Sequence, residues 1–353
     1  MFAQCKKCVL DSTEVPDITF DQEGICSYCR QWERTAREIK ASKSDLPWIY
    51  DSIRKEGSGK EYDVLLGLSG GVDSSTCLHY LVQNGIRPLC FSVDNGWNDP
   101  KADENIMRLV EGLKVPFFRY VLDLDKFKEL QAAFLQAGVK NIEIPTDHVL
   151  MAATYEMAEK YGIKTIIGGG NHATEGILPE SYGYQARDLK HIKAIYRKFI
   201  GKKLTGLPMI SLPGYLYHRF IRGTRIVNLL DFYDYDRESS INLLSERYGY
   251  KPYGEKHCEN TWTWWFQTFY LPTKWKLRKE KAHYSTLINS GQMTRSEALE
   301  LLALAPVYPE LGIEKRVLTQ YPRKEYYEYP NSEKWWKLLS TIYSYAKRIS
   351  KRS

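Results

Sequence analysis

Apolar runs of strand length alternate with amphipathic segments of helix length between residues 60 and 252. The predicted strands cover residues 63–68, 88–93, 117–122, 164–168 and 225–230. The helices predicted between and after them cover residues 74–84, 102–113, about 125–137, 147–161 and 238–248. Strands that alternate with helices predict a parallel sheet covered on both faces, with ligands at the carboxyl ends of its strands. The predicted fold class is therefore α/β, with a doubly wound parallel sheet.

The pattern changes in three places. Residues 176–222 are rich in Gly, Pro, Tyr and basic side chains, and we interpret them as an insertion into the α/β domain. Residues 31–60 read as a polar helix followed by a linker that ends in Gly-Ser-Gly. The remainder of the chain is helical, aromatic and basic. The predicted parts are a cysteine-rich segment with a linker helix (1–45), the α/β domain (60–252) and a helical C-terminal region (253–353).

The segment YDVLLGLSGGVDSS, residues 62–75, combines the first strand, a glycine turn and a helix start. A turn that allows positive φ, followed by a helix N-terminus, directs backbone N–H groups at an anion. Ordinary βα turns also use glycine with Ser or Asp caps, so this pattern alone leaves that alternative open. No G-x-x-x-x-G-K-[ST] motif occurs, which gives a P-loop kinase or GTPase no support. The candidate phosphate-binding residues are Ser69, Gly70, Gly71, Asp73, Ser74 and Ser75.

Two CxxC pairs lie near the start of the chain, Cys5 with Cys8 and Cys26 with Cys29, separated by seventeen residues. This spacing is typical of a four-cysteine zinc ribbon. Disulfides do not suit a cytosolic chain, and a redox CxxC would need only one pair. Four thiolates close the coordination shell of zinc, so we predict a structural ion. The acidic residues between the two pairs do not favour contact with nucleic acid.

The string TIIGGGNHATE, which includes the fourth strand, offers a second candidate loop. Its Gly168-x-Gly170-x-x-Ala173 also matches a dinucleotide fingerprint, and Asp188 lies near the distance expected of a ribose-binding acid. We reject that alternative because the match lies on a late strand and no second βαβ unit follows closely.

Composition bears on the class of protein, its location and its ligands. With 43% apolar and 26% charged residues, the 353-residue chain is ordinary for a globular protein. Charged residues interrupt the longest apolar runs and the start lacks a signal-peptide core, so we expect no membrane span and a cytoplasmic location. The net charge of +7 suits anionic ligands such as nucleotides, but it is spread along the chain and does not form a nucleic-acid footprint.

The string SGGVDSS resembles the pyrophosphate loop of the ATP pyrophosphatases, the superfamily of NAD synthetase and the tRNA thiolases. In that superfamily the loop binds the β- and γ-phosphates of ATP while the α-phosphorus is attacked. TIIGGGNHATE resembles the second loop of NAD synthetase-like members. The resemblance implies that Asp73 and Glu175 share Mg²⁺ as the catalytic pair, and that Gly168, Asn171 and Asp94 contact ATP. Asp94 alternatively belongs to an ordinary acidic turn at a strand end.

The two cysteine pairs, SGGVDSS, GGNHATE, the KHCEN segment with its aromatic helix, and KAHYSTLINSGQMTRSEAL together resemble the N-acetyl sugar amidotransferases. These enzymes act in bacterial O-antigen, pseudaminic acid and legionaminic acid assembly. The implied reaction transfers AMP from ATP to an acetamido oxygen, after which ammonia displaces AMP to give an acetamidino sugar. The implied cofactors are ATP, Mg²⁺ and a structural Zn²⁺.

The same resemblance suggests a nucleotide-sugar site and protein partners. The candidate substrate-binding residues are His257, Glu259, Arg278, Lys281 and His283. A solvated helix face, a core histidine and a surface glutamate are the alternatives at these positions. The chain shows no ammonia source of its own, since residue 2 is Phe2, so separate glutaminase and synthase subunits resembling those of histidine biosynthesis are implied. The aromatic helix at 261–270 is a candidate docking surface or a buried core helix.

Two other functions stay open from the sequence. A tRNA-modifying thiolase would also contain a zinc ribbon and a similar glycine loop. It would in addition need a persulfide cysteine or an iron–sulfur cluster. Cys77, Cys90 and Cys258 show no pairing that suggests either, and we interpret them as buried thiols. A non-catalytic scaffold subunit is the second alternative, and the unbroken loop motif argues against it.

Overall fold

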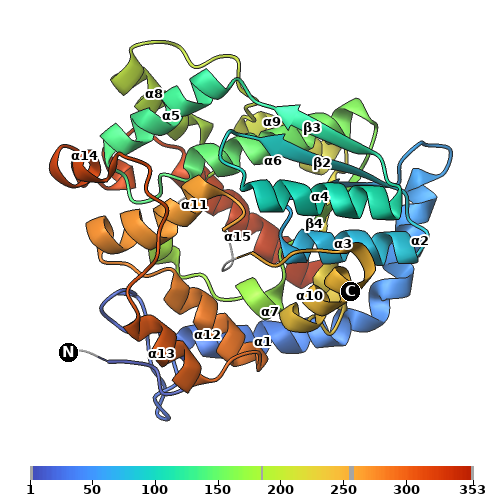
Figure 1. The fold of residues 1–353 in the computed structure, drawn as a ribbon, viewed down its shortest axis with the longest axis horizontal. Helices are drawn as coiled ribbons and strands as arrows, with labels where there is room; N and C mark the ends of the chain where they lie inside the picture. The colour runs from blue at the N-terminus through green and yellow to red at the C-terminus, as the bar shows by residue number, and fades with distance from the viewer. Residues whose placement is uncertain (1–2, 184–185, 254–257, 351–353) are drawn as a thin grey trace.

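The computed structural model describes residues 3–183, 186–253 and 258–350, and Figure 1 shows their fold. A five-stranded sheet lies at the centre, in the order β3-β2-β1-β4-β5, and all four neighbouring pairs are parallel. The strands are β1 (Val64–Gly67), β2 (Pro88–Asp94), β3 (Phe117–Val121), β4 (Thr165–Gly168) and β5 (Arg225–Asn228). The predicted parallel α/β sheet is confirmed.

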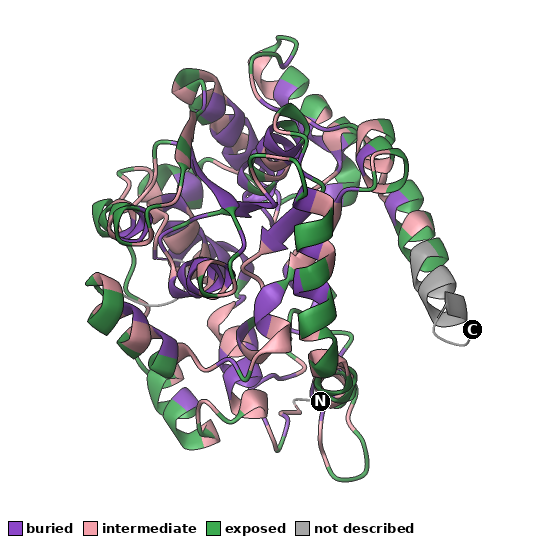
Figure 2. Ribbon diagram, turned by 90° about the vertical axis from the view of Figure 1, so that its right-hand side faces the viewer, coloured by how far each residue is buried: buried purple, intermediate pink, exposed green. Residues whose placement is uncertain are grey.

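Helices cover both faces of the sheet because successive strand residues point to opposite sides. On β1, Val64 and Leu66 pack against one set of helices, whereas Leu65 packs against another. The first set is α2 (Leu46–Gly57), α3 (Val72–Gln83), α4 (Pro100–Leu113) and α10 (Arg237–Tyr248). The second is α5 (Leu124–Ala137) and α6 (Ile144–Lys160). Figure 2 shows the central strands buried and the outer helix faces exposed, so the sheet is doubly wound.

The strand order creates a switch point between β1 and β4. From β1 the chain adds β2 and β3 on one side, then returns to place β4 on the other side of β1. Loops that leave β1 and β4 therefore run in opposite directions and open a crevice at the carboxyl edge, which is where ligands bind in such sheets. The last strand ends at Asn228, two residues before its predicted end, because Leu229–Phe232 form a 3₁₀ turn, η4.

The segment predicted as an insertion is helical in part. It contains η2 (Glu180–Tyr182), α8 (Leu189–Ile200), α9 (Leu212–Leu216) and a π-helical turn η3 (Tyr217–Ile221). Asp188 caps α8 and is 1% exposed. Its carboxylate accepts hydrogen bonds from Tyr326 and from the backbone of Ser332, so it holds the C-terminal region and not a ribose.

The cysteine segment and the C-terminal region share one hydrophobic cluster, although they are far apart in sequence. The N-terminal elements are α1 (Ser27–Ser42) and η1 (Lys43–Asp45). The C-terminal ones are α11 (Thr261–Trp265), η5 (Phe266–Trp275), α12 (Glu280–Ser290), α13 (Arg295–Ala303), α14 (Glu314–Thr319), η6 (Tyr326–Glu328) and α15 (Glu333–Ser350). In Figure 1, α12 lies beside α1, and α13 lies beside α12.

The aromatic helix is part of this core. Trp262 is 2% exposed, Trp265 is fully buried, and the aromatic side chains of the following turn are buried as well. The helix widens from α to π geometry at Phe266 and continues through Pro272, whose ring nitrogen cannot donate a helical hydrogen bond. The segment is the buried core helix that was the alternative to a docking surface. None of the described helices combines the length and the apolar character needed to cross a membrane.

Candidate functional site

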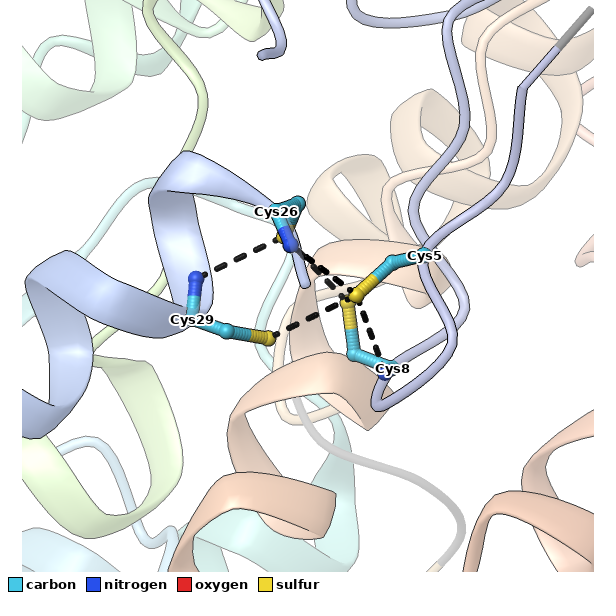
Figure 3. Close-up of side chains that lie close together, drawn as sticks. All are labelled: Cys5, Cys8, Cys26 and Cys29. Carbon is cyan, nitrogen blue, oxygen red and sulfur yellow. Dashed lines mark hydrogen bonds between the residues drawn. The ribbon is translucent and has the colours of Figure 1, made fainter. Parts of the chain in front are cut away.

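The four N-terminal cysteines lie together (Figure 3) and are all buried. Their sulfur atoms lie within 4.8 Å of one another, with Cys5 and Cys29 4.0 Å apart and Cys8 and Cys26 3.7 Å apart. Four sulfurs about 2.3 Å from one tetrahedral ion would lie about 3.8 Å from one another. The geometry therefore fits a single metal ion.

Hydrogen bonds to the sulfurs support this interpretation. The backbone N–H groups of Cys8 and Cys26 donate to the Cys5 sulfur at 3.4 and 3.3 Å. The side-chain amide of Asn289 on α12 donates to the Cys29 sulfur at 3.2 Å. Such donors stabilise thiolates, the form in which cysteine binds a metal. Asn289 also ties the cysteine cluster to the C-terminal region.

The glycine turn after β1 has the geometry of an anion site. Gly70 has φ +79°, and a Cβ built there would lie 2.2 Å from the carbonyl oxygen of Ala102 at the start of α4. Only glycine fits this position. Gly71 caps α3 without a side chain, so Asp73 and Ser74 lie in the first turn and its N–H groups point out of the helix end. The Ser74 hydroxyl donates to the Gly71 carbonyl at 3.2 Å and fixes the turn.

The loop after β4 lies against this turn because β1 and β4 are paired neighbours, with Leu66 opposite Ile167. A Cβ at Gly169 would lie 3.4 Å from the Ser74 nitrogen, which shows how closely the two loops approach. Asn171 then caps α7 (His172–Glu175) by accepting a hydrogen bond from the Thr174 N–H at 2.8 Å. Gly168 ends β4 beside Asn228 of β5. Asn171 and Gly168 thus shape the loop.

Asp73 and Glu175 line one cavity of about 210 Å³, together with Ser69, Gly71 and Ser74 of the loop. The Tyr235 hydroxyl donates to the Asp73 carboxylate. Two carboxylates beside a phosphate-binding turn are the donor set that Mg²⁺ takes when it also binds phosphate oxygens. The side chains present therefore fit the ion that the resemblance implies, and the structure brings together the two predicted residues.

The helix that carries Glu175 is held by α1 of the cysteine segment. The Trp32 indole N–H donates to the His172 carbonyl at 3.1 Å, and the two rings stack with centroids 4.8 Å apart. The other face of α7 contacts α12, where the His283 Nδ1 lies 3.1 Å from the Thr174 carbonyl. Ser75 and Thr76 are fully buried behind the loop. Helix α1 of the cysteine segment therefore supports one wall of the candidate site.

A second cavity of about 1390 Å³ adjoins the first and shares Gly67, Ser69 and Glu259 with it. The carboxyl end of β2, the start of α6, α11 and α15 all contribute to its walls. A pocket for one small ligand typically measures about 300–1,000 Å³. The larger volume has room for a nucleoside and a second substrate side by side.

The remaining predicted site residues do not all lie in the cavities. Glu259 lines both cavities, whereas His257 lies outside the described residues. Asp94 accepts a hydrogen bond from the Gly96 N–H at 2.9 Å in a strand-end turn, and its neighbour Asn95 lines the large cavity instead.

The three basic candidates line neither cavity and contact the fold. Arg278 donates to Glu280 at 2.8 Å, and Lys281 forms ion pairs with Asp11, at 2.7 Å, and with Glu14. His283 contacts α7, as described above. These three side chains therefore do not reach either cavity.

The cavity wall contains charged residues that the sequence did not single out. Glu143 and Asp147 lie at the start of α6, and Lys279 caps α12. Lys279 belongs to the same basic run as Arg278 and Lys281. The one available signal was the i, i+4 spacing of Glu143 and Asp147, which is common on any exposed helix and points to no site by itself.

The thiols outside the cluster are buried. Burial, with the charge of Asp73, raises the pKa of Cys77, and burial raises that of Cys90 to about 12. Cys258 is 7% exposed. A thiol that stays protonated is a poor nucleophile, so Cys77 and Cys90 fit the prediction of inert side chains.

A doubly wound sheet with a glycine loop and two carboxylates at its switch point defines an α/β protein with a candidate anion site. Residues 259–343 match the family described as LPS biosynthesis protein WbpG-like, C-terminal domain. The match lies within the C-terminal region and is a similarity of that region. No curated protein matches the chain.

Solved structures with a similar arrangement include NMN synthetase from Francisella tularensis (16% identity, TM-score 0.31, covering 62% of this chain and 98% of that one). A second is NH3-dependent NAD synthetase from Campylobacter jejuni (17%, 0.29, 64% and 99%). A third is U34-tRNA thiolase NcsA from Methanococcus maripaludis with its [4Fe-4S] cluster (13%, 0.34, 89% and 91%). Similarity at this level does not indicate what the chain binds.

Proposed function

We propose that the chain is an ATP-dependent amidotransferase that converts the acetamido group of an N-acetylated nucleotide sugar into an acetamidino group for a bacterial surface glycan. The observation that carries this proposal is the pair of adjoining cavities. One holds the glycine loop with Asp73 and Glu175, and the other has room for a nucleoside and a sugar. The C-terminal match to a lipopolysaccharide biosynthesis family supports the choice of a sugar substrate.

The chemistry requires activation before substitution. An amide is a weak electrophile, and its oxygen is a poor leaving group. The amide oxygen attacks the α-phosphorus of ATP, pyrophosphate leaves, and the amide N–H proton is lost to give an O-adenylyl imidate. Ammonia then adds to the imidate carbon, and the C–O bond breaks with its electron pair going to AMP. The oxygen of the acetamido group thus leaves within the phosphate of AMP.

The residues of the small cavity serve the first step. The turn at Gly70 and Gly71, with the N-terminus of α3, directs N–H groups at the β- and γ-phosphates and stabilises charge on the departing pyrophosphate. Asp73 and Glu175 would hold Mg²⁺, which when bound neutralises phosphate charge and orients the triphosphate. No nucleophilic side chain is needed.

Two further parts of the proposal concern metal and partners. We assign zinc to the cysteine cluster, because a closed shell of four thiolates is typical of structural zinc. Ammonia would come from a separate glutaminase subunit, with a synthase partner, because the buried Cys77 and Cys90 do not suit a glutaminase nucleophile. The same burial disfavours persulfide chemistry, and with it tRNA thiolation.

The test incubates the purified chain with Mg-ATP, ammonium ion and a panel of N-acetylated UDP- and CMP-sugars, with bulk tRNA as the rival substrate. AMP, pyrophosphate and product mass are measured. We expect AMP formation that depends on one sugar, and a product in which NH replaces O. The Asp73→Ala variant should lose this activity, whereas a scaffold would tolerate the change. AMP release with tRNA alone would contradict the proposal in favour of a thiolase.

A further inference from the structure

The large cavity is strongly acidic, which does not suit an anionic nucleotide sugar alone. Its described walls carry six carboxylates and two ammonium groups. These are Asp17, Glu143, Asp147, Glu180, Glu259 and Glu333, with Lys279 and Lys337. An excess of negative charge around a cavity attracts cations. The proposed reaction involves two cations: the ammonium ion that supplies nitrogen and the amidinium group of the product.

Two of these carboxylates form a pair at the start of α6. Glu143 caps the helix, and the Asp147 N–H donates to the Glu143 carbonyl at 3.0 Å, so both side chains lie on one helix face. Glu143 is 7% exposed, and its carboxylate accepts a hydrogen bond from the Thr263 hydroxyl at 2.6 Å. That bond fixes Glu143 against α11. A buried, oriented carboxylate beside a second one is a prepared binding site for a cation.

Asp147 differs from Glu143 in being exposed, and it lines the cavity. Within the described part of the chain, its carboxylate accepts no hydrogen bond, and Lys279 is the charged group that acts on it. The wall also carries one buried, unsatisfied group, since Ser92 on β2 is 4% exposed and its hydroxyl has no hydrogen-bond partner among the described residues. Buried polar groups without partners are uncommon in proteins. The Ser92 hydroxyl therefore indicates that the cavity is completed by a polar ligand.

The titration of the pair suits proton transfer near neutral pH. Burial, with the nearby charge of Asp147, raises the pKa of Glu143 to about 7. Burial raises the pKa of Asp147 to about 6, although the charge of Lys279 opposes the shift. A general base works best when its pKa lies near the working pH. At neutral pH the pair can therefore hold a cation or accept one proton.

We propose that Glu143 and Asp147 form the subsite for the incoming nitrogen, with Asp147 contacting the ammonium ion and Glu143 held beside it by Thr263. This assignment rests on the proposed amidotransferase function. A carboxylate of the pair takes one proton from ammonium, which frees a lone pair to form the C–N bond. As the C–O bond to AMP breaks, two hydrogens stay on the new nitrogen and the third moves to the imidate nitrogen. The resulting amidinium cation then faces the pair.

The first experiment separates the two half-reactions in Asp147→Asn and Glu143→Gln variants. Sugar-dependent exchange of labelled pyrophosphate into ATP reports adenylation, and amidino product at varied ammonium concentration reports substitution. We expect exchange to persist in both variants, while the KM for ammonium rises at least about tenfold in Asp147→Asn, as when a contact to a charged group is lost. Asp51→Asn, which removes an exposed carboxylate outside both cavities, should leave the KM for ammonium unchanged.

Each outcome decides between the assignments. If the rates of pyrophosphate exchange and of amidino product formation fall together in folded variants, the pair binds the sugar and the proposed subsite is wrong. If neither changes, the pair has no role. If the native chain shows no sugar-dependent exchange, the proposed function itself fails, which is a different result from a defect confined to the variants.

A binding measurement tests the subsite without turnover. Acetamidinium is titrated calorimetrically into the Mg-ATP-free chain, with neutral acetamide as the matched control. We expect acetamidinium binding that increases as the pH rises through the range from about 6 to 7, because the charged pair is the binding form. Lys279 acts on this titration. The other charged groups that line the same cavity are Asp17, Glu180, Glu259, Glu333 and Lys337. Equal binding of acetamide and acetamidinium, or no loss in Asp147→Asn, would overturn the proposal.

Discussion

Replacing Lys281 with Met tests whether this lysine holds the fold together or binds substrate. Lys281 on α12 forms ion pairs with Asp11, at 2.7 Å, and with Glu14, both in the cysteine segment. The three side chains are 17%, 4% and 9% exposed. The Met side chain keeps most of the volume but removes the charge. Two nearly buried carboxylates then lose their shared cation.

The expected cost follows from the contacts that remain. Breaking a buried ion pair by removing one partner typically costs about 3–5 kcal/mol, because the other charge is left uncompensated. Asp11 keeps the N–H groups of Thr13 and Glu14 as donors, and Glu14 keeps that of Arg278. We therefore expect the lower end, about 3 kcal/mol, which is roughly a hundredfold change in the folding equilibrium.

The measurement compares thermal and urea unfolding of the native chain and the variant. Lys324→Met is a matched control, since Lys324 pairs with Glu328 at 2.6 Å on an exposed helical turn, and such a pair contributes about 0.3–0.5 kcal/mol. The KM for the sugar nucleotide should not change in Lys281→Met. A loss of stability no larger than that of the control, together with a raised KM, would refute the structural role and restore Lys281 as a substrate residue.

The pH dependence gives a second check. Burial raises the pKa of Asp11, but the hydrogen bond and charge of Lys281 lower it by more, so the net pKa lies below its ordinary value. A carboxyl whose pKa is lowered by folding stabilises the protein above its unfolded pKa, about 3.9, and loses that contribution as the pH falls further. The difference in stability between the native chain and Lys281→Met should therefore shrink below about pH 4.

Three further predictions concern the candidate site. Gly70→Ala should abolish ATP binding, measured by calorimetry, because its Cβ would lie 2.2 Å from the Ala102 carbonyl oxygen at a φ of +79°; retained affinity would contradict the loop geometry. Glu175→Gln should lower the turnover number by about 10²–10³ and weaken the dependence on Mg²⁺, since one ligand loses its charge; an unchanged Mg²⁺ titration would count against the assignment. Elemental analysis should find one zinc per chain, and Cys29→Ser should lose it and unfold at a lower temperature; iron in place of zinc would contradict the zinc assignment.

The sequence by itself determined the features that depend on neighbouring residues. Strand and helix periodicity located all five strands to within two residues of their ends, because side-chain alternation is a local property. The spacing of the CxxC pairs predicted that the four cysteines lie together, and the glycines of SGGVDSS predicted the turn with positive φ. The resemblance to NAD synthetase-like loops implied that Asp73 and Glu175 act as a pair, and they line one cavity.

Tertiary structure alone decided the features that depend on distant contacts. Lys281 and Lys279 are two residues apart on a basic helix start, yet one pairs with Asp11 in the cysteine segment and the other lines the large cavity. The near-neutral pKa of Glu143 comes from burial, which the hydrogen bond from Thr263, far along the chain, opposes only in part. Charge and burial of this kind depend on which surfaces meet, and a local pattern carries no record of them.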